Sequence, residues 1–307
     1  MHSRTGHLTG ALIGLAAAFA VGYLLLKSAA QLHWIAELYQ SSPPGGQPGV
    51  TQPPPSFAVH GSVSAAGMLL VIAVITGLLA STWRLSPLAP LLAGLPLVAV
   101  GLYPIVILPL AGPSAYLAMQ TWMWSLPDLL GLGSDDLWAS GIWLLLGGIM
   151  LVSAAMPWRW TGKLAPAGRD RTGIGVLIGV FCIFGLWYLL QLAKPVSYGL
   201  VLQAAAATVI GAFAAARWVS PVAAVLSGIP LLTVGLLLVI APVSAARWTS
   251  WLVFGAQPIS VDSGQSLSLG VLVLVGGLLL VSAAAPWRWR QPSTPPAAVP
   301  AAMAEAS

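Results

Sequence analysis

The chain has 307 residues, of which 58% are hydrophobic and 6% are charged, and its formal net charge is +5. In a soluble globular domain about a quarter of the residues are charged, so this composition and a mean hydropathy of +0.91 exclude a soluble protein. The basic residues stand singly beside apolar runs rather than in a stripe, so we expect the partner to be a lipid bilayer and not a nucleic acid.

The first predicted membrane span covers residues 8–29. A cleaved signal peptide is the alternative, but the motif Gly10-Ala-Leu-Ile-Gly14 recurs inside the chain as Gly175-Val-Leu-Ile-Gly179, and a leader would not recur as an internal span. We expect the helix to continue over 30–39 at the membrane surface. Residues 40–57, rich in Pro and Gly, are predicted to form a flexible or polyproline-like loop.

Three more spans follow, over 61–82, 87–111 and 137–157. Residues 112–136 are semi-apolar and Trp-rich, which is typical of an interfacial or re-entrant hairpin. The fourth span ends at Pro157-Trp158-Arg159-Trp160, where indole rings and an arginine are suited to the headgroup layer.

The same ending recurs as Pro286-Trp287-Arg288-Trp289, after a second run of four predicted spans over 173–192, 197–217, 221–243 and 266–285. Each span is near the ~20 residues that a helix needs to cross a bilayer. The segment from Ser86 to Leu102 also matches the segment from Ser220 to Leu236. We therefore predict an all-α membrane protein with eight transmembrane helices, arranged as two tandem four-helix repeats in parallel orientation.

The predicted domains follow these repeats. Residues 1–160 form the first unit, with long extracytoplasmic loops, and residues 161–172 form a basic cytoplasmic linker. Residues 173–290 form the second unit, and the Pro/Ala-rich tail 291–307 is expected to be disordered and cytoplasmic.

The positive-inside rule gives the orientation. Cytoplasmic termini place nine of the twelve Lys and Arg residues inside and leave three outside, Lys27, Lys194 and Arg247. Arginine outnumbers lysine nine to three in an Ala- and Gly-rich chain, which favours a bacterial source and hence the plasma membrane.

Two motifs in the spans have both a structural and a functional interpretation. Gly10 and Gly14 lie on one helix face and allow close packing, either against the fifth span or, as we favour, against a neighbour in the same unit. Pro96 and Pro230 lie at matching mid-span positions. They are candidate helix kinks, which mark a transport path in some carriers but more often serve packing.

The candidate recognition surface lies on the outer side, because the two predicted units differ mainly in their outer loops. Its residues are Trp34, Glu37, Trp122, Trp124, Asp135 and Asp136. An outer-face enzyme built on His33, Glu37 and His60 is a weaker alternative. We expect no cofactor and no metal, because no HExxH, GxSxG, paired-cysteine or phosphate-loop motif is present.

No Asp, Glu, Lys, Arg or His lies in the middle of a predicted span, which disfavours ion-coupled transport. We therefore expect a non-enzymatic, multi-pass membrane protein that works as an assembly or interaction component of a membrane complex with another membrane protein. The alternative is an uncoupled permease or lipid-handling carrier with its path between the two repeats.

Overall fold

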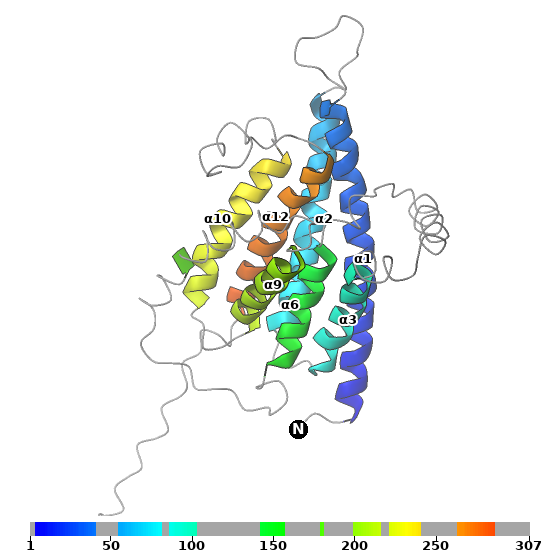
Figure 1. Cartoon of the computed structure of the whole chain (residues 1–307), viewed down its shortest axis with the longest axis vertical. Helices are drawn as coiled ribbons and strands as arrows, with labels where there is room; N and C mark the ends of the chain where they lie inside the picture. Colours follow the sequence, from blue (N-terminus) through cyan, green and yellow to red (C-terminus); the bar gives the residue numbers. More distant parts are fainter. Residues whose placement is uncertain are drawn as a thin grey trace, which may run out of the picture.

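The computed structural model describes residues 4–40, 55–81, 86–102, 142–156, 179–180, 199–215, 221–240 and 263–285. Within these ranges all regular structure is helical (Figure 1). The helices are α1 (Arg4–Gln40), α2 (Pro55–Ser81), α3 (Leu88–Leu102), α6 (Ile142–Ala155), α9 (Gly199–Ala215), α10 (Pro221–Ile240) and α12 (Ser263–Ala283). The predicted all-α class is confirmed for this part of the chain.

Three of these helices contain a segment long and apolar enough to cross a membrane: Gly6–Leu32 in α1, Val59–Ser81 in α2 and Pro221–Ile240 in α10. The described parts of the other four give shorter apolar segments, Leu88–Leu102, Ile142–Ala155, Ala204–Ala215 and Gly270–Ala283. All seven segments overlap predicted spans, and this apolar helical construction is compatible with a membrane protein. Of the predicted fifth span, 173–192, the structure describes only residues 179 and 180.

Two boundaries near the outer loop can be compared with the predictions. Helix α1 runs without a break to Gln40, which confirms that the first helix continues over 30–39. Helix α2 begins at Pro55, so the predicted loop 40–57 is too long at its end. A proline is well suited to the first helical turn, because its missing N–H would have no intrahelical acceptor there.

The helices pack as one bundle (Figure 1). We call residues 1–160 the first half of the chain and 173–290 the second half. In the first half, α1 packs against α2 and α3, and α3 packs against α6; in the second half, α10 packs against α12. The halves meet where α2 packs against α12 and where α6 packs against α9. One hydrophobic core runs through all seven helices.

Corresponding residues of the two halves are buried alike. Each residue from 88 to 102 has the same degree of burial as its counterpart from 222 to 236, whether exposed, half-buried or buried. Residues 145–147, 149, 150, 153 and 154 of α6 are buried, as are their counterparts 274–276, 278, 279, 282 and 283 of α12. Thus α3 and α10 present equivalent faces to their neighbours, and so do α6 and α12.

Candidate functional site

The predicted recognition surface lies almost wholly outside the described residues. Trp34 and Glu37 belong to α1, but their side chains are not described, and Trp122, Trp124, Asp135 and Asp136 fall in the undescribed range 103–141. His33 also belongs to α1, and its side chain is not described either. His60 is an exposed residue of α2. Among the described residues no group of three His, Cys, Asp or Glu side chains lies together as a metal site would need.

Both candidate kinks lie inside continuous helices. Pro96 is within α3 and Pro230 is within α10, and both are half-buried. A proline supplies no N–H to the carbonyl four residues earlier, here that of Leu92 or Leu226. The prolines therefore weaken the two helices at the same point.

Glycines on either side of each proline hold its helix against a neighbour. A Cβ built on Gly94 would lie 2.8 Å from the Gly147 carbonyl oxygen of α6, and one built on Gly228 would lie 3.1 Å from the Gly276 carbonyl oxygen of α12. At these distances an added Cβ would require the neighbouring helix to move, so each glycine allows a close approach of the two backbones. About two turns after Gly94 and Gly228, Gly101 contacts Leu144 and Gly235 makes the corresponding contact with Val273.

The halves meet through two equivalent contacts between a glycine and a valine. A Cβ on Gly77 of α2 would lie 2.9 Å from the Cβ of Val281 in α12. A Cβ on Gly211 of α9 would lie 2.9 Å from the Cβ of Val152 in α6. Each glycine also faces a backbone carbonyl of the helix opposite, that of Leu278 or of Ile149. A valine of each half thus fills the gap left by a glycine of the other.

A second pair of contacts has the same form. A Cβ on Gly148 of α6 would lie 2.7 Å from the Cβ of Ala207 in α9, and one on Gly277 of α12 would lie 2.9 Å from the Cβ of Ala73 in α2. At these points the surface between the halves cannot accept an additional methyl group without movement.

Sequence reasoning did not identify this surface between the halves. Gly148 and Gly277 stand in the repeated stretch before Pro-Trp-Arg-Trp, and an alignment of the second and sixth spans would have paired Gly77 with Gly211. The glycines that we did single out pack as we favoured: Gly10 faces Ser86 and Gly14 faces Ala89, both within the first half. Gly179 makes the corresponding contact with Ala223.

Buried hydroxyl groups gather near the C-terminal end of α2. The Ser153 hydroxyl of α6 donates to the Ala80 carbonyl oxygen at 2.9 Å, and the Ser81 hydroxyl donates to the Gly77 carbonyl oxygen at 2.7 Å. The Thr76 side chain is 1% exposed, and its hydroxyl oxygen has no hydrogen-bond partner among the described residues. In a medium without water such an unpaired group costs free energy.

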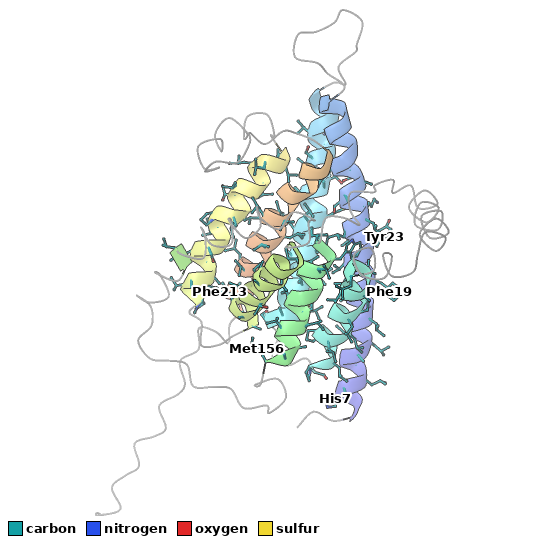
Figure 2. All side chains as sticks on the ribbon, in the orientation of Figure 1. His7, Phe19, Tyr23, Met156 and Phe213 are labelled. Carbon is teal, nitrogen blue, oxygen red and sulfur yellow. The ribbon has the colours of Figure 1, made fainter. Side chains whose placement is uncertain are left out.

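The outward face of α1 is apolar and aromatic. Leu8, Leu12, Leu15, Phe19 and Tyr23 recur at helical spacing, with Phe19 78% exposed. Figure 2 shows Phe19 and Tyr23 pointing away from the bundle. The Lys27 ammonium lies 5.9 Å from the Tyr23 ring centroid, a cation–π distance. The composition of this face is suited to contact with lipid.

The N-terminal end of α1 is tied to the start of α3. The His7 Nδ1 and the Ser86 hydroxyl oxygen lie 2.8 Å apart and share a hydrogen bond. Ser86 also accepts the Leu88 backbone N–H at 3.2 Å, as an N-cap residue does. His7 therefore contacts the residue that caps α3, and this contact indicates a structural role for the histidine.

No family model, curated protein or solved structure matches the chain. Its function is therefore argued from its own residues.

Proposed function

We propose that the chain is a plasma-membrane protein of eight transmembrane helices, built as two tandem four-helix units in parallel orientation and related by a pseudo-two-fold axis. Two observations support this architecture. Corresponding residues of α3 and α10 are buried alike. The contacts of Gly77 and Gly148 with the second half recur as those of Gly211 and Gly277 with the first half.

We further propose that the protein has no enzymatic activity of its own and serves as an assembly or interaction component of a membrane complex. The observation that carries this proposal is the close contact between the halves. At Gly77, Gly148, Gly211 and Gly277 a single added Cβ would come within 3 Å of the opposite half. Surfaces packed this closely hold helices together. Contacts with other molecules are then expected on the outer face and in the loops.

The recognition surface of this proposal is on the outer side of the first unit, on Trp34, Glu37, Trp122, Trp124, Asp135 and Asp136. Its test is to replace residues 41–54 and 119–136 with short Gly/Ser linkers. The trimmed protein should insert and unfold like the parent, because the described helices are unchanged, but should lose a partner that co-purifies with the parent in mild detergent. A trimmed protein that retains the partner, or that complements a deletion strain, would contradict the proposal.

The orientation that goes with this proposal puts both termini in the cytoplasm. In a Cys182→Ser background, a cysteine at Gly45 should react with a membrane-impermeant reagent in intact cells, and a cysteine at Ser3 should react only after permeabilisation. The reverse pattern would contradict the orientation.

A permease or lipid-handling carrier remains the second candidate, and the matched positions of Pro96 and Pro230 favour it. Transport between the units would require the surface between the halves to open around these weakened helices. Pro96→Ala and Pro230→Ala would then reduce solute flux or lipid retention, with the double variant more affected than either single variant. If the variants alter thermal stability and leave flux in reconstituted vesicles unchanged, the prolines serve packing and the carrier loses its support.

A further inference from the structure

Four pairs of corresponding residues in the surface between the halves are identical. They are Ala73 and Ala207, Gly77 and Gly211, Gly148 and Gly277, and Val152 and Val281. Ile149 and Leu278 differ, but each contributes only a backbone carbonyl oxygen at Gly211 or Gly77. Leu70, whose Cδ2 lies 3.6 Å from a Cβ on Gly277, corresponds to Ala204, so the two sides differ at this point.

Each half carries both members of the contact. The first half offers a gap at Gly77 and fills the gap at Gly211 with Val152, while the second half offers the gap at Gly211 and fills the gap at Gly77 with Val281. A surface with both a gap and the side chain that fits it meets the condition for an isologous interface, in which a copy of the surface contacts itself.

We propose that this surface is self-complementary: the first half fits a second copy of the first half through the same contacts that it makes with the second half. In such a pair, Gly77 of one copy meets Val152 of the other, and Ala73 meets Gly148. A freed half can therefore bind another copy of this chain. This inference rests on packing alone and holds whether the protein assembles with a partner or carries a solute.

Within one chain the second half competes for this surface at a high effective concentration, so the test must first displace it. Gly211→Leu and Gly277→Leu, placed together in the full-length chain, add side chains where even a Cβ would lie 2.9 Å from Val152 or Ala73. The first half keeps its native surface in this blocked variant.

The test uses two differently tagged copies of the blocked variant, co-expressed and extracted in mild detergent. Purification through one tag should recover the other. Unblocked chains with the same two tags should give little of this product, because the second half of each chain covers its own first half.

A second variant keeps the test valid if the first fails to fold. Gly77→Leu with Gly148→Leu frees the second half, and two differently tagged copies of this variant should then co-purify. A chain blocked in both halves is the control and should give no co-purified copy. If neither singly blocked variant pairs with its tagged copy, the surface is not self-complementary and the proposal is wrong.

Discussion

Gly77 of α2 and Val281 of α12 lie so close together that a Cβ on the glycine would be 2.9 Å from the valine Cβ. The two residues come from different halves of the chain, and Gly211 and Val152 repeat the relationship with the halves exchanged. In a membrane the hydrophobic effect does not drive helices together, so close contacts of this kind supply much of the association energy. The two glycines are therefore positions between the halves where the bundle is sensitive to side-chain size.

Gly77→Ala should destabilise the protein, because the added methyl group meets Val281 and overpacking of this kind costs about 1–3 kcal/mol. Val281→Ala in the same chain should restore part of the loss, whereas Val152→Ala should not, because Val152 faces Gly211. Thermal unfolding in detergent measures both effects. Gly67→Ala is the matched control on the same helix. A Cβ there meets no atom of the described residues within 4 Å, so this variant should not lower the unfolding temperature. Equal effects at positions 67 and 77 would contradict the packing argument.

Ser153→Ala should remove a hydrogen bond between two helices, from the serine hydroxyl of α6 to the Ala80 carbonyl oxygen of α2. Such bonds in membrane proteins contribute about 0.6 kcal/mol on average and up to about 1.7 kcal/mol. Ser227→Ala is the control, since the Ser227 hydroxyl donates to the Ala223 carbonyl oxygen of its own helix. The free energy of unfolding should fall for Ser153→Ala and stay nearly constant for Ser227→Ala; the opposite order would show that the Ser153 bond does not join the helices.

Ser86→Ala should have a larger effect than His7→Ala. The serine variant loses the N-cap of α3, which costs about 1 kcal/mol, together with its bond to His7. The histidine variant keeps the cap. Because the two residues share one bond, the double variant should lose less stability than the sum of the single variants in a double-mutant cycle. Strict additivity in the unfolding free energies would mean that the 2.8 Å contact contributes nothing.

Much of the fold could be predicted because membrane spans follow from apolar length and composition alone. The helices α2, α3, α9, α10 and α12 lie where apolar runs predicted spans. The start of α2 was placed too late, because Pro55 and its neighbours have the composition of a loop, whereas a proline also fits the first turn of a helix.

The surface between the halves was harder to predict, because every face of these helices is apolar and hydrophobic periodicity does not separate a buried face from a lipid-facing one. Phe19 is 78% exposed and Ile72 is fully buried, although both are large apolar residues in mid-span. Small residues are the better signal in a membrane. Gly77 and Gly148 mark the surface between the halves, but identifying it required knowing which helices are neighbours.

Thr76 is a position where the buried face of α2 differs from the corresponding face of α9. Its counterpart in α9 is Ile210, which is fully buried. The Thr76 side chain is 1% exposed, and within the part of the chain that the structure describes its hydroxyl has no hydrogen-bond partner. A buried unsatisfied hydroxyl costs about 1–3 kcal/mol, and valine has nearly the same shape without it. Thr76→Val should therefore raise the free energy of unfolding by about 1 kcal/mol.

The control for Thr76→Val is Thr208→Val, on the exposed face of α9, where the hydroxyl donates to the Ala204 carbonyl oxygen at 2.7 Å. This variant should leave the unfolding temperature nearly unchanged, because its hydroxyl is not buried without a partner. Thermal unfolding of both variants in detergent compares them directly. If Thr76→Val is less stable than the parent, the Thr76 hydroxyl has a polar partner in the folded protein, such as a buried water or a bound polar molecule, and the interior of α2 is not purely a packing surface.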